Sequence, residues 1–330
     1  MMRVLVVEFI TGGGIPASAP LPASLVREGD LMLGSLLRDL AAVPGIEIVT
    51  TRDARLDPPA FGTVHRVEGG RPAWQTWATL AWKVDALWPV APETGGELER
   101  LSRLGLAAGV ALLNSRPDAV HVTARKSSTA QRLAAAGIAV APTYPGRQAP
   151  PGPGPWVAKP DDGAGCGDTV LLDDLEAWAH WRAAADRRDF VLQPFVEGVP
   201  ASLSMICREG SAWLLSVNRQ AISRVGGSFA YAGGTVAGLA ATAAHRRLAT
   251  AVAEAIPGLF GHVGVDFVET PDGPVVIEVN PRLTTSYAGL GRATGLNVAS
   301  LVLDLLTGVP ALPAAQKAPS PVEVAVMVKA

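Results

Sequence analysis

The chain has 330 residues and a mass of 34.1 kDa, with 48% hydrophobic residues, 18% charged residues and a net charge of −2. This length and composition predict a folded protein of more than one compact unit and exclude a single small module or a disordered chain. The weakly acidic balance excludes a strongly basic surface for nucleic acid or an anionic membrane, so small molecules are the expected partners.

The cysteine content and the hydropathy favour a cytoplasmic protein. Cys166 and Cys207 are too few for a disulfide framework and are expected to be small buried thiols. No run reaches 18 apolar residues and no signal-peptide core precedes the first strand, so neither a membrane span nor a leader is expected. The histidines lack a zinc-binding spacing.

The first third of the chain predicts a small parallel sheet. An apolar run at 3–9 is followed by three glycines at 12–14 and then by a helix around 33–40, whose leucines recur at i, i+3, i+4 and i+7. A second strand at 46–49 completes a βαβ pattern. The loop 91–96, with the sequence APETGG, lies where such sheets carry ligand-facing loops. The tryptophans of this region are expected mostly in the core: Trp74, Trp77, Trp82 and Trp88.

The rest of the chain predicts an α+β arrangement. Helices are expected near 124–136, 173–186, 243–255 and 297–307, and strands at 156–159, 190–193, 202–207 and 212–217. The Pro- and Gly-rich stretch 141–155 predicts a stiff loop at a subdomain boundary. The Gly-rich stretch 226–234 is interpreted as a lid, an acceptor wall or a disordered loop, and acceptor specificity is expected in loops 226–238 and 284–292. The expected domains are 1–115, 116–192 and 193–330.

A predicted β-hairpin near the end of the chain carries the strongest chemical pattern. If residues 271–273 form a three-residue loop, Asp266 lies opposite Glu278 and shares its face with Asn280. Two acids placed in this way repel each other unless a cation lies between them. The pattern therefore indicates either a metal site for Mg²⁺ or a solvated face of the hairpin.

A lysine followed by a glycine-rich loop is a candidate phosphate site. Lys159 ends a predicted strand and precedes glycines that let backbone N–H groups approach a phosphate: Gly163, Gly165 and Gly167. Only five of the 28 basic residues are lysine, so a retained lysine suggests a need for a compact ammonium group. Chance remains the interpretation for Lys83, Lys317 and Lys329.

Two further segments are candidates for ligand contacts. The connector QPFVEG follows a strand and could bind an adenine edge through main-chain groups left free at its bend: Gln193, Pro194, Phe195, Val196 and Glu197. Arg219 and Arg282 are candidates for phosphate, because a guanidinium stays charged and binds in a bidentate manner. A surface arginine is the alternative for each.

Taken in chain order, these motifs resemble the ATP-grasp superfamily: Lys126, Lys159 with its glycine loop, QPFVEG, Asp266 and the run Glu278 to Arg282. The resemblance implies an ATP-grasp fold after a Rossmann-like pre-ATP-grasp domain. It implies that Lys126 and Lys159 hold the phosphates of ATP, that 193–197 reads adenine, and that Asp266, Glu278 and Asn280 hold Mg²⁺ or, alternatively, Mn²⁺. Superfamily members often have an acid for ribose where this chain has Val199 and Pro200, which leaves Glu197 as a weak candidate.

Further segments are similar to the tyramine-glutamate ligase group, whose members act in methanofuran-type cofactor synthesis. They are Glu8-Phe9 with Gly12–Gly14, Arg27–Asp30, the loop 91–96 and Asn280–Tyr287. This resemblance implies that glutamate and tyramine are joined through an acyl phosphate, with Arg282 and Lys159 as catalytic residues. The weaker candidates for substrate contacts are Arg219, Tyr231, Thr284 and Ser286.

Several alternatives stay open at this point. One is an ATP-grasp ligase for another amino acid or amine, and another is a catalytically silent nucleotide-binding module. A dinucleotide oxidoreductase using residues 11–14 is disfavoured, because the GxGxxG spacing is missing. The oligomeric state is open, with a homodimer among the alternatives.

Overall fold

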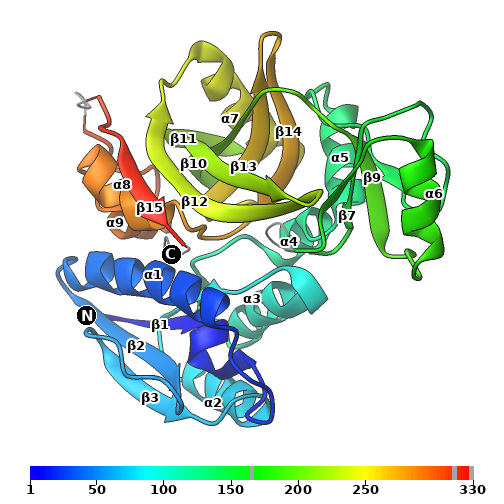
Figure 1. Ribbon diagram of the computed structural model, residues 1–330. Coiled ribbons are helices and arrows are strands. Elements are labelled where there is room, and N and C mark those ends of the chain that lie inside the picture. Colours follow the sequence, from blue (N-terminus) through cyan, green and yellow to red (C-terminus); the bar gives the residue numbers. More distant parts are fainter. Residues whose placement is uncertain (164–166, 314–317, 327–330) are drawn as a thin grey trace.

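The computed structural model describes residues 1–163, 167–313 and 318–326. Two sheets carry the fold of this part of the chain: a parallel sheet in the N-terminal unit and a larger antiparallel sheet in the remainder (Figure 1). The predicted combination of an α/β unit with α+β units is therefore confirmed. The division at 115/116 and 192/193 remains a prediction.

The N-terminal unit is built on a five-stranded parallel sheet, as far as the described residues show. Its elements are β1 Met2–Glu8, η1 Ile10–Gly14, α1 Ala23–Ala41, β2 Ile46–Asp53, β3 Thr63–Val67, α2 Arg71–Ala81, β4 Ala86–Val90, η2 Thr94–Gly96, α3 Glu97–Ala107 and β5 Ala111–Leu112. The strand order is β3-β2-β1-β4-β5. The carboxyl ends of β1 and β4 thus meet where the order reverses, which is the usual place for a ligand crevice in an open parallel sheet.

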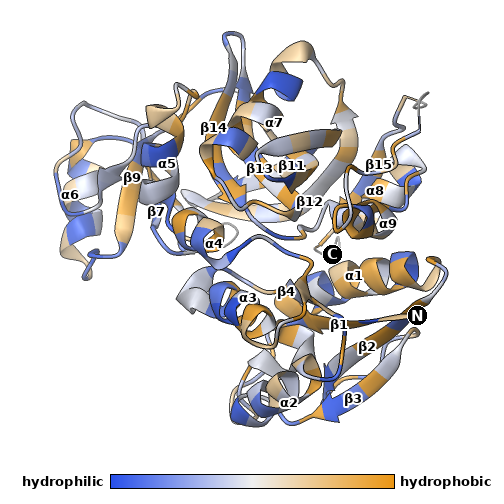
Figure 2. Cartoon of the chain, turned by 180° about the vertical axis from the view of Figure 1, so that it is seen from behind, coloured by the Kyte–Doolittle hydropathy of each residue, from blue (hydrophilic) through white to orange (hydrophobic). Residues whose placement is uncertain are grey.

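Alternating residues of β1 explain how helices cover both faces of this sheet. Val4 and Val6 belong to the cluster that contains the leucines of α1, whereas Leu5 and Val7 pack with Trp77 of α2 and with α3. Buried on both faces, the strand reads as a continuous apolar run. Apolar residues accordingly predominate in β1 and β4, while the tip of the hairpin at 270–273 is hydrophilic (Figure 2).

The antiparallel sheet continues through both remaining subdomains. The elements are α4 Pro117–Thr123, α5 Lys126–Ala135, β6 Tyr144–Pro145, β7 Trp156–Pro160, β8 Val170–Leu172, α6 Leu175–Ala183, β9 Phe190–Pro194, β10 Val199–Arg208, β11 Ser211–Val225, β12 Ser228–Leu239, α7 Ala243–Ala255, β13 Gly261–Thr270, β14 Gly273–Asn280, α8 Tyr287–Thr294, α9 Val298–Asp304 and β15 Val322–Ala325. The strand order is β14-β13-β10-β11-β12-β8-β7-β9-β6, with β15 paired to β12. Within the described ranges, the two halves of the sheet join where Ser228 of β12 pairs with Val170 of β8.

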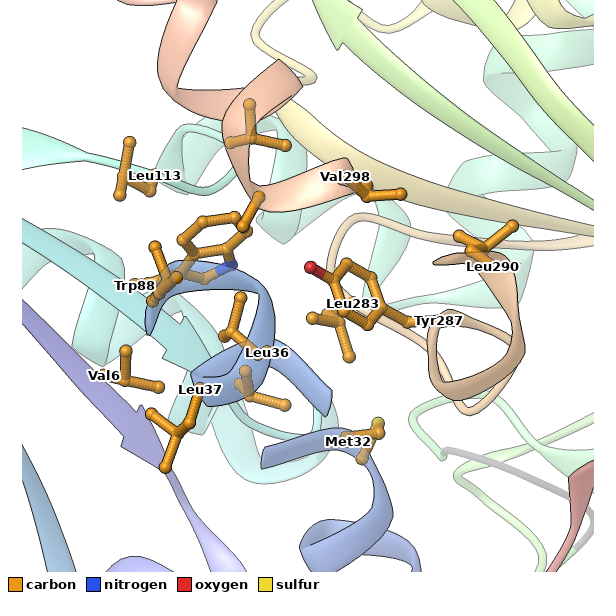
Figure 3. Close-up of a cluster of buried hydrophobic side chains, with 14 of the residues drawn as sticks. Val6, Met32, Leu36, Leu37, Trp88, Leu113, Leu283, Tyr287, Leu290 and Val298 are labelled. Atoms are coloured by element: carbon orange, nitrogen blue, oxygen red, sulfur yellow. The ribbon is translucent and has the colours of Figure 1, made fainter. Parts of the chain in front are cut away.

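We call the part with α4–α6 and β6–β9 the small subdomain and the part with β10–β15 and α7–α9 the large subdomain. One hydrophobic cluster spans the N-terminal unit and the large subdomain. Figure 3 shows Val6, Met32, Leu36, Leu37 and Trp88 of the N-terminal unit together with Leu283, Tyr287 and Leu290 from the other side. Tyr287 also donates a hydrogen bond from its hydroxyl to Asp39 Oδ2 at 2.8 Å. The segment that follows β14 is therefore packed onto α1 and β4.

Two expectations about local structure are wrong. Residues 228–239 form the paired strand β12 rather than a loop, although their glycines carry a turn-like composition. Residues 287–294 form α8, so the expected acceptor loop at 284–292 is mostly helix. The tryptophans lie mostly in the core, as expected: Trp77 and Trp88 are buried and Trp74 packs against the cluster of Trp77, whereas Trp82 is 68% exposed. No helix among the described residues is long and apolar enough to cross a membrane.

Candidate active site

The β13–β14 hairpin places Asp266 directly opposite Glu278, which confirms the predicted pairing. The expected three-residue loop at 271–273 is wrong. Only Pro271 and Asp272 separate the paired residues Thr270 and Gly273. A two-residue turn alone would move the register by one position. A β-bulge at Ile277, which has no paired partner, supplies the additional residue and restores the pairing.

The acid pair lies among amide groups that orient it. Asp266 accepts hydrogen bonds from Gln220 Nε2 at 2.9 Å and from Asn280 Nδ2 at 3.1 Å. Burial, and then the charge of Glu278, raise the pKa of Asp266 to about 7, against the opposing effects of the Asn280 hydrogen bond and of nearby Arg282 and Lys159. A cation bound between the two carboxylates would remove this repulsion.

These residues fit a magnesium ion. Their donors are two carboxylates and an amide oxygen, and hard oxygen donors are what Mg²⁺ prefers. The site is not a cage of acids, since the described residues contain no group of three or more His, Cys, Asp or Glu side chains placed to hold a metal. A site with few protein ligands suits Mg²⁺, which usually keeps several waters or binds phosphate oxygens.

Lys126 connects the acid pair to the glycine loop. It begins α5, and its side chain is only 4% exposed. Its Nζ donates to the Gly163 carbonyl at 2.6 Å and lies 3.7 Å from Glu278 Oε1. Asp161 holds the start of α5 against the same loop by accepting from the Ser127 backbone N–H and hydroxyl. A buried ammonium thus lies between the two subdomains.

Lys159 and the described glycines lie on the small-subdomain side. Lys159 is 6% exposed at the end of β7, paired across the sheet with Val191. A Cβ added at Gly163 would lie 3.2 Å from Pro160 Cβ and in ordinary contact with Lys126 Nζ at 3.9 Å, whereas Gly167 has open space around it. Gly165 lies outside the described residues. The roles of these residues in phosphate binding remain predictions.

The connector 193–197 follows β9 as expected, but its backbone is not wholly free. The Phe195 N–H donates to the Pro155 carbonyl at 3.0 Å. Gln193 is buried and its side-chain amide donates to Thr143 Oγ1 at 2.9 Å, so this side chain is engaged within the subdomain. Phe195 and Val196 are half-buried and Glu197 is exposed. An adenine contact here remains a prediction.

Arg282 lies at the contact between the large subdomain and the N-terminal unit. Its Nε and its NH2 group donate to Glu93 Oε2 at 3.1 and 3.0 Å. Burial disfavours the charged guanidinium, but surrounding glutamates, Glu93 foremost, more than offset this effect and raise the pKa of Arg282. His262 Nδ1 lies 3.2 Å from the Arg282 carbonyl, which can only accept, so this nitrogen carries the proton.

Three of the four weaker substrate candidates, all but Thr284, line a small hollow of about 10 Å³ beside Asp266. Its lining includes Arg219, Gln220, Tyr231 and Ser286, together with Ser202 and Asn218. Thr284 joins through its hydroxyl, 2.9 Å from Ser286 Oγ, and Ser286 Oγ lies 2.9 Å from Ser204 Oγ. The result is a polar wall rich in hydroxyl groups, next to the acid pair.

The sequence analysis did not identify four residues that contact the site residues: Glu28, Glu93, Asp161 and Gln220. Glu28 accepts from the Thr285 hydroxyl at 2.8 Å. Glu28 and Glu93 were within motifs that carried the family resemblance, which was their only signal. Gln220 follows the candidate Arg219, but its orientation toward Asp266 depends on the pairing of β10 with both β11 and β13.

Two family profiles match the chain: a pre-ATP-grasp domain over residues 46–120 and an ATP-grasp domain over residues 123–286. The fold is also similar to a crystal structure of an ATP-grasp superfamily protein from Archaeoglobus fulgidus. That comparison has a TM-score of 0.73 and 24% identity and covers 98% of this chain and 99% of the other. It shows the fold.

Two further similarities concern ligases. The chain is 29% identical over 213 residues to the tyramine–L-glutamate ligase of Methanocaldococcus jannaschii, covering 63% of this chain and 58% of that protein. The match therefore spans less than two thirds of the relative. An L-amino acid ligase from Bacillus licheniformis has a similar structure, with a TM-score of 0.69, 16% identity, and coverage of 94% of this chain and 75% of the other.

Proposed function

Because the chain belongs to the ATP-grasp superfamily, we propose that it is an ATP-dependent carboxylate-amine ligase that joins glutamate to tyramine. The observation that carries the ligase chemistry is the Asp266–Glu278 pair with Asn280 beside it and the Lys126 ammonium 3.7 Å from Glu278. The similarity to a tyramine–L-glutamate ligase supports the choice of substrates. Cytoplasmic methanofuran-type cofactor synthesis is the proposed setting.

The proposed reaction has two balanced steps. A carboxylate oxygen of the acid attacks the γ-phosphorus of ATP, a P–O bond forms, and the bond to ADP breaks. The amine nitrogen of the second substrate then attacks the carbonyl carbon of the acyl phosphate, inorganic phosphate leaves, and the nitrogen loses one proton. The sum is ATP, acid and amine giving ADP, phosphate and an amide. Neither step needs a nucleophile from the protein.

The protein would supply position and charge to both steps, as in other phosphoryl transfers. Lys126 and Lys159 would bind the ATP phosphates under the loop 161–168. Arg282 would stabilise the transferring phosphoryl group. Asp266, Glu278 and Asn280 would hold Mg²⁺, which when bound neutralises phosphate charge. The connector 193–197 would hold adenine.

The polar side chains around the hollow beside the acid pair would contact the carboxyl end of the acid substrate. Arg219 is exposed in it and offers a guanidinium to a carboxylate, while the hydroxyl groups of Tyr231 and Ser286 offer hydrogen bonds. Because the hollow adjoins Asp266, a carboxyl group bound there would lie close to the proposed metal.

The test is a ligase assay with Mg²⁺-ATP, glutamate and tyramine, following ADP release and the mass of γ-glutamyltyramine. We expect turnover with wild type and a loss of roughly a hundred- to a thousandfold in Glu278→Gln, because a charge that would hold the metal is removed. The matched control is Asp272→Asn, an exposed acid in the turn of the same hairpin, which should keep activity.

The outcomes separate the alternatives. Turnover with other acids or amines but not with this pair would retain the ligase and reject the substrates. ATP binding with no turnover across a panel of amino acids and amines would indicate a silent nucleotide-binding module. Full activity of Glu278→Gln would refute the metal assignment.

A further inference from the structure

The loop 91–96 of the N-terminal unit contacts both subdomains that frame the proposed nucleotide site. At one end Glu93 receives the two Arg282 hydrogen bonds, and at the other the Gly95 N–H donates to Asp162 Oδ2 at 3.1 Å. Asp162 belongs to the segment that leads into the glycine loop. A loop outside the two nucleotide-binding subdomains thus bridges them.

The ion pair between Glu93 and Arg282 is almost fully enclosed. The side chains are 6% and 12% exposed, and the closest approach, Nε to Oε1, is 3.0 Å. A buried arginine that loses its carboxylate partner is left with an uncompensated charge, so this pair strongly favours one guanidinium position. Arg282 also donates from NH1 to the carbonyl of the next residue, Leu283, at 3.2 Å.

The backbone on either side of Arg282 is anchored to the same unit. Leu283 and Tyr287 are buried against α1 and β4 (Figure 3), and Thr285 donates its hydroxyl to Glu28. These contacts fix the chain position of Arg282, but a long side chain still has many rotamers. Glu93 is the group that selects the rotamer.

We propose that Glu93 is a positioning residue, which holds the Arg282 guanidinium in the orientation needed for phosphoryl transfer. The inference rests on the proposed function for the role of Arg282. It gives the pre-ATP-grasp unit a direct part in the chemistry, through a carboxylate that need not touch substrate. Small misplacements of a catalytic group cost rate more than affinity, so the effect should fall on kcat.

The experiment compares Glu93→Gln and Glu93→Asp with wild type. Glutamine removes the charge and replaces one acceptor oxygen with an NH2 group that can only donate, so kcat should fall about ten- to a hundredfold while Mg²⁺-ATP affinity is retained. Aspartate keeps the charge on a stem shorter by one methylene and should restore part of kcat. Glu99→Gln, which removes the charge of a half-buried α3 acid paired with Arg103 and His121 instead of with Arg282, is the matched control and should behave as wild type.

A double-mutant cycle separates positioning from a general structural role. If Glu93 acts through Arg282, Glu93→Gln should cost little more when Arg282 is already alanine. The proposal would be overturned if the losses in kcat from Glu93→Gln and from Arg282→Ala multiplied in the double variant. It would also be overturned if Glu93→Gln kept the wild-type kcat.

A second readout does not depend on turnover. Phenylglyoxal labelling of Arg282, followed by peptide mass spectrometry, should be slow in wild type and in Glu99→Gln and faster in Glu93→Gln. Equal labelling of wild type and Glu93→Gln would overturn the anchoring. If wild-type protein joins no acid to any amine, the proposed function fails, while the labelling result still decides whether Glu93 holds Arg282.

Discussion

Charged side chains around the proposed site are buried and partnered, which defines their positions. Lys126 contacts the Gly163 carbonyl, Arg282 contacts Glu93, and Asp266 accepts from two amide groups. Burial without a partner would cost several kcal/mol per charge, so each side chain has one strongly preferred position. Such preorganised charge is what phosphoryl transfer requires of a protein.

Glu8, at the end of β1, is a buried acid for which the structure predicts a pH effect. Burial raises its pKa to about 7, against hydrogen bonds from the Thr11 N–H and hydroxyl, both at 2.6 Å. The folded protein therefore binds a proton between pH 4.5 and 7 that the unfolded chain releases. This group's contribution to the free energy of unfolding is greatest at low pH and declines as pH rises through that window.

Glu8→Gln should remove this dependence. Relative to wild type, the variant should gain about 3 kcal/mol in the free energy of unfolding between pH 4.5 and pH 8. Urea unfolding of both proteins at the two pH values measures the difference, with the exposed Glu68→Gln as control. A constant difference between wild type and Glu8→Gln across this range would contradict the assignment.

At the scale of elements, turns and bulges set the registers that bring site residues together. The β-bulge at Ile277 keeps Asp266 opposite Glu278 despite a two-residue turn. The β10–β11 pair has a two-residue turn of its own, at Glu209 and Gly210, and carries Ser202 and Gln220 to the same region. Errors in either register would send these side chains to the opposite face.

The β10–β11 turn offers a stabilising substitution. Glu209 and Gly210 have φ values of +49° and +80°, as a type I′ turn requires, and Asn-Gly suits this conformation better than Glu-Gly. Glu209 is exposed and its Arg208 contact is long, at 3.5 Å. Glu209→Asn should therefore raise the free energy of unfolding by about 0.5 to 1 kcal/mol.

Chemical denaturation at neutral pH measures this change as a higher midpoint with an unchanged slope. Gly210→Ala, which adds a Cβ at positive φ, should lower the midpoint and serves as the opposite control. If the Glu209→Asn midpoint were at or below that of wild type, the conformation of this turn would not limit the stability of the protein.

At the scale of the whole molecule, the N-terminal unit and the large subdomain share one hydrophobic cluster. Leu283 is 1% exposed in that cluster and lies one residue after Arg282 (Figure 3). Two units that share a core gain their stability together, so we expect them to unfold in one transition. The shared packing also explains why a carboxylate of one unit can orient an arginine of the other.

Leu283→Ala tests this coupling. The cavity should lower the free energy of unfolding by about 2 to 5 kcal/mol and should shift the whole transition. Tryptophan fluorescence and far-UV circular dichroism should still give coincident curves. Leu25→Ala, at a partly exposed leucine of α1, is the control. Separate transitions in wild type would indicate that the units fold independently.

Much of the fold follows from local patterns, and the exceptions have local causes. The leucine spacing predicted α1, and alternation predicted β13 and β14, because burial of one face requires these periods. Strand β12 was missed because its glycines have low strand propensity, and pairing with β11, β15 and β8 stabilises it. The exposed Trp82 shows that a large apolar residue alone does not define a core.

The amino-acid sequence by itself determined the chemical inventory: scarce lysines, a glycine-rich loop, and acids with an asparagine on one hairpin face, in an order that resembles ATP-grasp proteins. Only the tertiary structure decided which charged side chains contact each other. Glu93 and Arg282 are 189 residues apart, and Lys126 reaches Glu278 only across two subdomains. Periodicity reports burial within one element, whereas contacts between elements depend on how their faces pack, and no local pattern encodes that.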